Sequence, residues 1–235
     1  MMSNILTIAD KEVRSYLASP AVYIVMIIFL SLTGWFFSNT LFIDGGRAEM
    51  SSHFNLIPFL FLFFIPAITM KMISEEKKSG TLESLLTLPL MGKEIIIGKF
   101  AGSLIVVTAA VLFTFPNLLT VGILGKPDWG IIITGYLGLL LLGASLTSIG
   151  IYSSTITDNQ ILAFILSFFA IFILIMLDDL LIFLPFSEFF EYISIKSHYD
   201  NMLKGIIDTK DLIYFISIIL LFLTAASESI ESKRK

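Results

Sequence analysis

The residues whose types and spacing could support a function lie mainly between residues 72 and 93. This segment opens with the polar run Ser74-Glu75-Glu76-Lys77-Lys78 and continues with Gly80-Thr81, which is typical of the start of a helix. Glu83 would then lie in the first turn, where a negative charge suits the helix dipole. The pattern predicts a short helix with a polar face, and the chemistry it offers is recognition of another surface.

Three leucines give this predicted helix an apolar face. Leu82, Leu85 and Leu86 follow the i, i+3, i+4 spacing of one helix side, and Pro89 ends the helix. Such a face must be buried against something. Two partners remain open at this point: the chain's own helix ends or the lipid surface, and a separate cytoplasmic subunit with a matching groove.

Signatures of catalysis are missing from the sequence. It contains no G-x-x-x-x-G-K-[ST] loop, and the Gly-Lys pairs at 92–93, 98–99 and 125–126 lack the glycine and the Ser or Thr that phosphate and magnesium binding need. There are no cysteines, and the two histidines, His53 and His198, lie far apart. The chain is therefore expected to have no enzymatic activity, no cofactor and no metal site of its own.

The composition is that of a membrane protein. Of the 235 residues, 56% are hydrophobic and 14% are charged, against about 45–50% and about 25% in soluble domains. The mean hydropathy is +0.92. A core of this size cannot bury so much apolar surface, so part of it must face lipid. The net charge of −4, without a basic face, excludes a nucleic-acid binder.

Long stretches without charged residues locate the membrane spans. About 20 helical residues cross a hydrocarbon layer of about 30 Å. The chain is therefore expected to form a single all-helical membrane domain, residues 1–235, with six transmembrane helices. We place them at roughly 21–43, 54–73, 94–122, 131–155, 160–183 and 211–227.

Orientation follows from the basic residues. With the N-terminus inside, ten of the fifteen Lys and Arg residues fall in inner segments and five in outer loops, which fits the positive-inside rule. Six spans return the C-terminus, with Lys233-Arg234-Lys235, to the cytoplasm. Before the first span, residues 4–18 carry an apolar face typical of a helix in the membrane interface, and Ser19-Pro20 marks the break.

Two features are expected on the outer side. Residues 184–210 are amphipathic and aromatic, which predicts a segment that lies in or dips into the outer interface. Asp178 and Asp179 lie near the outer end of the fifth span, and two adjacent carboxylates cannot both face lipid cheaply. They could line an outward vestibule or be ordinary interfacial charges, and the second reading is favoured.

Small residues predict close helix packing. Gly98 and Gly102 form a GxxxG pair, and the fourth span carries several glycines and serines, which indicates a tight bundle or a dimer seam. Acidic and basic side chains are almost absent near the middle of the spans. This disfavours an ion-coupled carrier, so the free energy for any transport would enter from another subunit.

Three stretches of the sequence resemble the ABC-2 type permeases. The most specific covers residues 66–70, the run from Ser74 to Leu86, and Pro89, with the core E-K-x-x-G-T-x-E-x-L-L. Residues 145–150 and 157–160 resemble the end of the fourth span and its turn, and 197–199 with 205–215 resemble the segment before the sixth span. The sequence is most similar to the permeases associated with gliding motility and with nitrous-oxide-reductase maturation.

The resemblance implies a six-helix subunit that works as a homodimer or heterodimer above two cytoplasmic ABC ATPases, which would hold the ATP and magnesium. Residues 74–92 would form the cytoplasmic coupling loop, 1–19 the elbow helix and 184–210 an extracellular re-entrant hairpin. The spans near 21–43 and 131–155 would line a central path. The residues assigned in this way to ATPase coupling are Glu75, Glu76, Gly80, Thr81, Leu82, Glu83, Ser84, Leu85 and Leu86.

The function implied is that of the permease subunit of an ATP-driven exporter in the cell (inner) membrane. Membrane lipid and a periplasmic or extracellular accessory protein would be further partners. Mechanical work on lipid-anchored or periplasmic partners fits the same sequence. The alternative from another class is a non-transporting structural or assembly protein of a motility, secretion or metalloenzyme-maturation complex.

Overall fold

The computed structural model describes residues 2–42, 49–125, 127–181 and 192–232, and every regular element within those ranges is a helix. The helices are α1 (Met2–Ala18), α2 (Pro20–Phe42), α3 (Ser51–Thr69), α4 (Ser74–Lys78), α5 (Thr81–Thr87), α6 (Gly92–Leu112), α7 (Phe115–Leu124), α8 (Trp129–Ile156), α9 (Gln160–Leu181), α11 (Ile195–Met202) and α12 (Thr209–Glu231). Among the described residues, six helical segments are long and apolar enough to span a membrane, which confirms the predicted all-helical polytopic fold.

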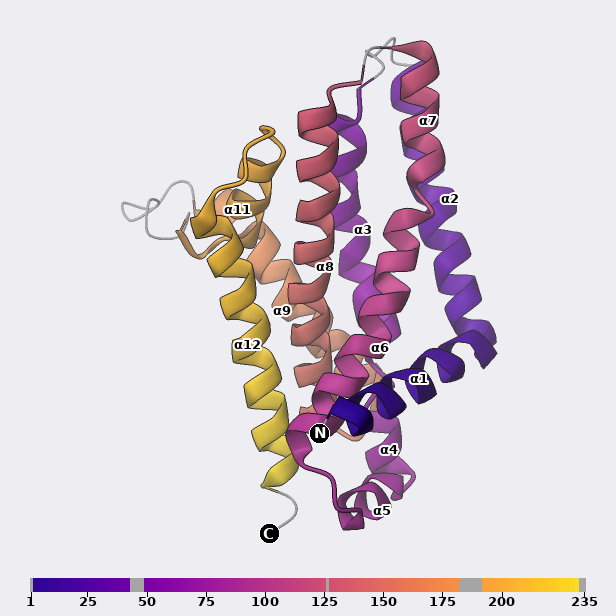
Figure 1. Ribbon diagram of the computed structural model, residues 1–235, viewed down its shortest axis with the longest axis vertical. Coiled ribbons are helices and arrows are strands. Elements are labelled where there is room, and N and C mark those ends of the chain that lie inside the picture. Colours follow the sequence, from indigo (N-terminus) through magenta and orange to yellow (C-terminus); the bar gives the residue numbers. More distant parts are fainter. Residues whose placement is uncertain (1, 43–48, 126, 182–191, 233–235) are drawn as a thin grey trace.

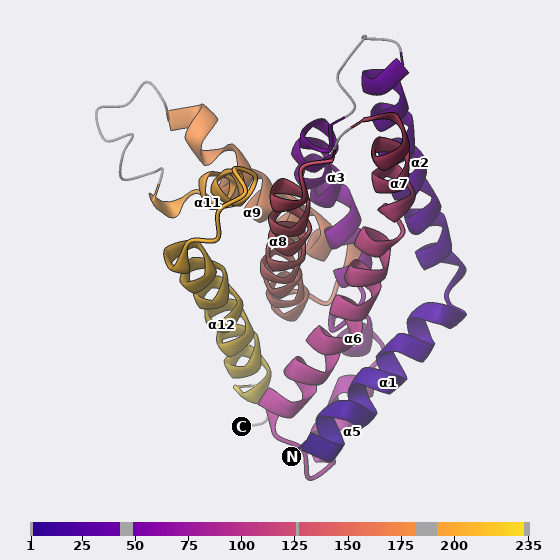
Figure 2. The same ribbon diagram turned by 45° about the horizontal axis from the view of Figure 1, so that its top comes forward.

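The spans run roughly parallel, and the connecting helices gather at the two ends of the bundle (Figure 1). The start of α1, the end of α12 and the short helices α4 and α5 lie together at one end, which we call the α5 end (Figures 1 and 2). The opposite end, which we call the α11 end, carries α11 and the end of α7. Helix α1 lies beside the first half of α6, at an angle to it, and packs against it.

Helix α8 is the central helix of the bundle. It packs against α3, α6, α9, α11 and α12, and it contributes more buried residues than any other described helix. Its glycines make this possible: a Cβ on Gly135 would lie 2.6 Å from the Phe54 ring, and one on Gly150 would lie 2.9 Å from Cβ of Thr69. The small residues of the fourth span therefore serve a tight bundle within this chain.

The predicted third span, 94–122, is not one continuous helix. The structure divides it into α6 and α7, with a turn at Phe113-Thr114 and a visible bend between the two axes (Figures 1 and 2). Pro116 is the cause, because it has no N–H to donate and its ring would clash with the carbonyl of Leu112 in a regular helix. The carbonyl of Val111 accepts hydrogen bonds from the hydroxyl of Thr114 at 2.6 Å and from the N–H of the same residue at 3.1 Å, which closes the end of α6 at this turn.

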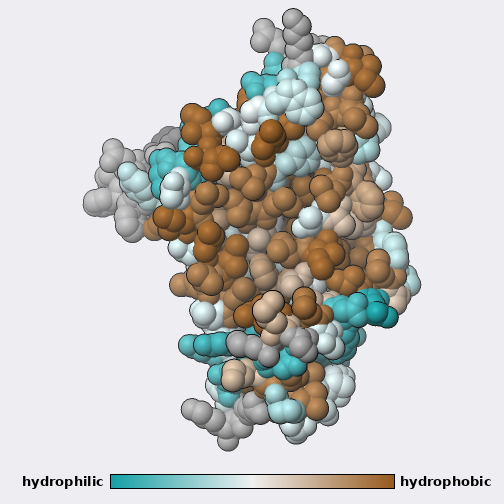
Figure 3. Space-filling view, viewed as in Figure 1, coloured by the Kyte–Doolittle hydropathy of each residue, from teal (hydrophilic) through white to brown (hydrophobic). Residues whose placement is uncertain are grey.

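The apolar surface of the bundle faces outward as a lipid-facing surface must. Figure 3 shows apolar residues over the middle of the molecule and polar ones toward its two ends. Helix α2 is the clearest case, since Ile24, Ile27 and Trp35 are each more than half exposed. The two spans predicted to line a central path differ in burial, since most of α8 is buried inside this chain while α2 is largely exposed.

Acidic caps fix the starts of two spans at the α11 end. One oxygen of Asp128 accepts hydrogen bonds from the backbone N–H groups of Gly130 and Ile131 and caps α8. Asp208 caps α12 by accepting from the N–H of Lys210 at 3.0 Å. That backbone hydrogen bond holds the pKa of the exposed Asp208 carboxyl below its usual value.

Candidate functional site

The α4–α5 segment forms a tight turn at the α5 end. Gly80 connects the two helices with a φ of +71°, a left-handed conformation that side chains with a Cβ adopt only with strain. Helix α5 begins at Thr81, and the hydroxyl of Ser79 lies 2.8 Å from that of Thr81. Leu88 is extended, because the backbone before Pro89 avoids the helical region, and the helix ends at Thr87.

The leucine face of α5 packs inside this chain. Leu82 and Leu86 are 4% and 8% exposed, and Leu85 is half-buried. They pack in an apolar cluster that also contains Ile73 of the α3–α4 turn, Ile95 of α6 and Ile230 of α12. Of the two partners left open by the sequence, the chain's own helix ends are therefore the one that holds Leu82 and Leu86.

The opposite face of α5 is open to solvent. Among the residues predicted for ATPase coupling, Glu75, Gly80, Thr81, Glu83 and Ser84 are exposed, and Glu76 is half-buried. Thr87 and Leu88 extend the exposed face to the end of the segment. The structure thus splits the predicted set into side chains that anchor α5 and side chains that a second protein could touch.

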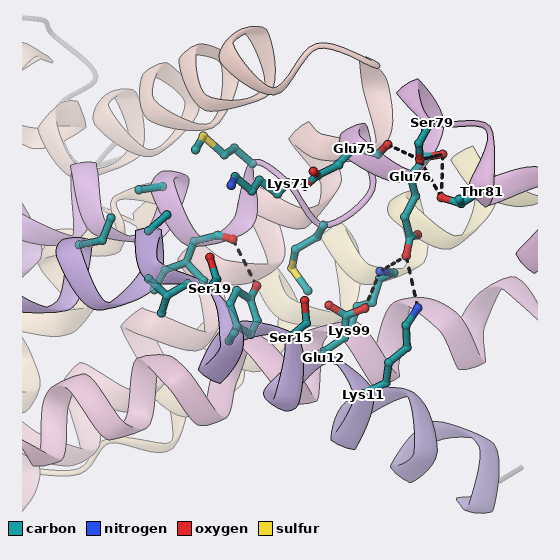
Figure 4. Close-up of a pocket in the computed structure, with 18 residues that line it drawn as sticks. Lys11, Glu12, Ser15, Ser19, Lys71, Glu75, Glu76, Ser79, Thr81 and Lys99 are labelled. Carbon is teal, nitrogen blue, oxygen red and sulfur yellow. Dashed lines mark hydrogen bonds and ion pairs between the residues drawn. The ribbon is translucent and has the colours of Figure 1, made fainter.

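A buried lysine ties three elements together beneath the bundle. The side chain of Lys99 on α6 is 2% exposed, and its ammonium donates to Glu12 of α1 at 2.7 Å and to Glu76 of α4 at 2.8 Å (Figure 4). Lys11 lies 3.9 Å from the same oxygen of Glu76. A buried cation with two carboxylate partners is stabilised only while both stay in place. The position of α4 is therefore linked to those of α1 and α6.

The GxxxG pair of α6 allows α1 to approach closely. A Cβ on Gly98 would lie 2.7 Å from the side chain of Ile8, and one on Gly102 would lie 2.7 Å from Cβ of Glu12. Of the two roles that the motif could have, the structure shows packing within the chain.

Helix α1 also contacts the end of α3. The hydroxyl of Tyr16 on α1 donates to the carbonyl of Ile68 at 3.2 Å. Burial, with a smaller contribution from the Glu12 charge, raises the pKa of Tyr16.

A second set of hydrogen bonds joins the α3–α4 connection to the central helix α8. The hydroxyl oxygen of Ser154 on α8 accepts from the N–H groups of Ile73 and Ser74, each at 3.0 Å, and donates to the carbonyl of Met70 at 3.1 Å. The ammonium of Lys77 donates to the carbonyl of Thr155. A displacement of α4 and α5 would therefore act on α8 as well as on α1 and α6.

A second polar cluster lies at the α11 end. Asp211, fully buried at the start of α12, has one carboxylate oxygen 2.6 Å from Nδ1 of His198 on α11. The imidazole stacks on Tyr214, with ring centroids 3.8 Å apart, and its Nε2 lies 3.1 Å from the carbonyl oxygen of Tyr192. The hydroxyl of the buried Tyr199 donates to the carbonyl of Phe54 at 2.9 Å, which attaches α11 to α3. These contacts hold the segment before α12 against the bundle.

The predicted vestibule residues and part of the predicted re-entrant segment lie outside what the structure describes in detail. The backbone of Asp178 and Asp179 belongs to the last turns of α9, and their side chains are outside the described ones. Of the segment 184–210, residues 192–210 are described. They hold α11 and a turn at Gly205, whose φ is +83°.

Sequence reasoning missed the cluster around Lys99 and the pair His198–Asp211. Lys99 is separated from Glu12 by 87 residues and from Glu76 by 23, so spacing along the chain gives no sign of their contact. One signal was available: Lys99 directly follows the first glycine of the GxxxG pair, and a helix that packs there brings its own polar side chains near this lysine.

A comparison with protein families decides what kind of membrane protein this is. The family model described as ABC-2 family transporter protein matches residues 6–228, nearly the whole chain. The chain belongs to the ABC-2 transporter family. An ABC-2 permease is the non-catalytic membrane component of an ABC system and normally works with a cytoplasmic ABC ATPase. A search among curated proteins finds no match to this ABC-2 protein.

Proposed function

We propose that this ABC-2 protein is the permease subunit of an ATP-driven exporter in the cell (inner) membrane, with the α5 end in the cytoplasm. The excess of basic residues in the segments at this end supports that orientation. Under this proposal both termini are cytoplasmic, and 1–235 is one transmembrane domain. The main support for the proposal is that one face of α5, with Leu82 and Leu86, is buried in this chain, while the opposite face, with Glu83 and Ser84, is exposed to solvent.

The exposed face of α5 is the proposed docking surface for the ATPase. Glu83 and Ser84 point away from the apolar cluster that holds Leu82 and Leu86. A groove of about 530 Å³ lies beside this face, between α5 and the α8–α9 turn, and Asp158 lines it together with Glu83. A segment of the ATPase could enter this groove and contact both carboxylates. Residues 74–92 then act as the coupling loop.

The contacts of α4 supply a route for mechanical coupling. ATP and magnesium, held by the partner ATPase, would drive closure of the ATPase pair and push on α5. The push passes to α1 and α6 through Lys99 and to α8 through Ser154. Rigid helices that shift together can tilt one half of a membrane complex against the other. The elbow helix, residues 1–19, is thus a part of the moving unit.

A second permease chain, identical or different, would complete the exporter. The exposed apolar face of α2 is the surface that we assign to this contact and to the transport path, with membrane lipid around the rest. Residues 184–210 would form the extracellular re-entrant segment, beside Asp178 and Asp179 at an outer vestibule, where an accessory protein could bind. The resemblance at residues 66–89 supports grouping this chain with the permeases of gliding motility and nitrous-oxide-reductase maturation.

Copurification tests the proposal. The tagged chain is coexpressed with the ABC ATPases of the same genome, and recovery of the ATPase is measured for the natural chain and for Glu83→Lys. Because Glu83 is exposed, the charge reversal should leave the fold intact and lower recovery by about tenfold or more, as for a residue at the centre of an interface.

Glu228→Lys is the matched control, since Glu228 is exposed on α12 near the same end of the bundle. It should leave recovery unchanged. Equal recovery of the ATPase with Glu83→Lys and Glu228→Lys would exclude the exposed face of α5 as the docking surface. Failure of any ABC ATPase to bind the natural chain would favour the non-transporting assembly protein.

A further inference from the structure

A cavity of about 390 Å³ lies where α1, α2, α3 and α4 meet at the α5 end (Figure 4). Its size falls within the range of about 300–1,000 Å³ that is typical of small-molecule sites. One part of the lining is polar and the other is apolar. The polar part is formed by Lys11, Glu12, Ser15, Ser19, Lys71, Glu75, Glu76 and Lys99. The apolar part includes Val22, Val25, Ala67 and Ile68.

A groove between the spans lies next to the apolar part of this cavity. The groove has a volume of about 320 Å³ and is lined almost entirely by apolar side chains of α2, α3 and α9. Val25 and Ala67 line both hollows, so the two are adjacent at these side chains. Farther from the cavity, the groove is bordered by Leu32, Leu60 and Phe164. Together they form one site with a polar end and an apolar channel.

The charges in the polar part are not all used by the protein. Lys99 and Glu12 neutralise each other, and Lys99 also binds Glu76, which lies within 3.9 Å of Lys11. Lys71 and Glu75 also line the cavity, and neither side chain has an ion pair or hydrogen bond with any described residue. The cavity therefore offers one free cation and one free anion within the part of the chain that the structure describes.

We propose that this site binds one phospholipid with a zwitterionic amine headgroup, of the phosphatidylethanolamine type. The phosphate binds Lys71, the ammonium donates to Glu75, and one acyl chain enters the groove past Val25 and Ala67. Charge complementarity selects the headgroup, because a lysine suits a phosphate and a carboxylate suits a group with N–H donors. Lipid binding itself requires no ATPase. With the proposed orientation, which places the α5 end in the cytoplasm, the lipid would come from the inner leaflet.

Native mass spectrometry of the full-length chain tests the proposal. The protein is purified in detergent, stripped of lipid and titrated with phosphatidylethanolamine, phosphatidylcholine or phosphatidylglycerol of identical acyl chains. One phosphatidylethanolamine should bind about tenfold or more tightly than phosphatidylcholine, whose ammonium has no N–H to donate. Soluble glycerophosphoethanolamine, which carries the headgroup alone, should bind far more weakly than the lipid, because it leaves the groove empty.

Three variants locate the site. Lys71→Gln should weaken phosphatidylethanolamine binding by about tenfold, whereas Lys78→Gln, which removes an exposed lysine outside the cavity, should not. Glu75→Gln should abolish the preference over phosphatidylcholine. Ala67→Phe should block the passage into the groove and bring the affinity for the lipid down to that of the free headgroup.

Each other outcome overturns the proposal. Equal binding of the three lipids would show a non-selective annular contact, and equal effects of Lys71→Gln and Lys78→Gln would place the lipid elsewhere. Binding of glycerophosphoethanolamine as tight as that of the lipid would identify a soluble phosphate ligand instead. The assay uses the permease chain alone, so a failure to recruit an ATPase leaves its result unaffected.

Discussion

The ammonium of Lys99 lies 2.7 Å from the carboxylate of Glu12, and this contact joins the first helix of the chain to the third membrane span. The same ammonium binds Glu76 at 2.8 Å. Lys99 is therefore shared between the elbow helix α1 and the coupling segment, two elements that the ABC-2 resemblance names separately. In this account they respond as one unit.

Loss of Lys99 should destabilise the protein strongly. Lys99→Met leaves Glu12 and Glu76 close together without their cation, and breaking a buried ion pair typically costs about 3–5 kcal/mol. The thermal midpoint in detergent should fall clearly below that of Lys78→Met, which removes an exposed lysine. Combining Lys99→Met with Glu12→Gln and Glu76→Gln should recover part of the loss, and no recovery would contradict the pairing.

Widening Gly102 should detach α1 from α6. The added Cβ of Gly102→Val would lie 2.7 Å from Cβ of Glu12 and 3.2 Å from the carbonyl oxygen of Ala9, so α1 must move outward. Trypsin should then cleave after the exposed Arg14 faster than in the natural chain. Gly122→Val is the control, because a Cβ there meets no atom within 4 Å. Similar cleavage in both variants would show that the close approach is unimportant.

The turn at Gly80 should tolerate asparagine better than valine. Its φ of +71° costs a residue with a branched Cβ about 1–2 kcal/mol or more, while asparagine adopts this region more readily. Gly80→Val should therefore loosen α4 and α5 and expose the bond after Lys78 to trypsin, and Gly80→Asn should do so much less. Equal protection of the two variants would contradict the left-handed turn.

The pair His198–Asp211 should stabilise the α11 end. His198→Phe keeps an aromatic ring against Tyr214 but removes a hydrogen bond from the buried Asp211, at a cost of about 1.5–3 kcal/mol. Asp211→Asn in the same chain should reduce this loss, because the amide no longer buries an unpaired charge. A thermal midpoint for His198→Phe equal to that of the natural chain would exclude a structural role for the pair.

The sequence predicted the spans well because each is a long apolar run bounded by charges, a property of neighbouring residues. It also predicted the short helix between Gly80-Thr81 and Pro89 from neighbouring residues, through the spacing of Leu82, Leu85 and Leu86. It did not predict the break between α6 and α7. The third span was placed by its apolar content alone, and the effect of Pro116 on the helix was not considered.

What the sequence could not provide is the identity of contacts between distant residues. The GxxxG pair at Gly98 and Gly102 indicated close packing, but only the structure shows that α1 of the same chain is the partner. Likewise, the sequence allowed two partners for the leucine face of α5, and only the structure shows that this face packs against other helices of the same chain. The ion-pair cluster around Lys99 depends on both of these packings and so was beyond local reasoning.

Accessibility of Ser84 tests the central claim most directly, since the chain has no cysteine and a single Ser84→Cys can be labelled without further changes. A membrane-impermeant maleimide should label it in inverted membrane vesicles and not in intact cells, while Lys204→Cys at the α11 end should show the reverse. Adding the ABC ATPase that copurifies with the chain should protect Ser84→Cys in the vesicles. Labelling of Ser84→Cys from the cell exterior, or unchanged labelling with the ATPase bound, would contradict the account.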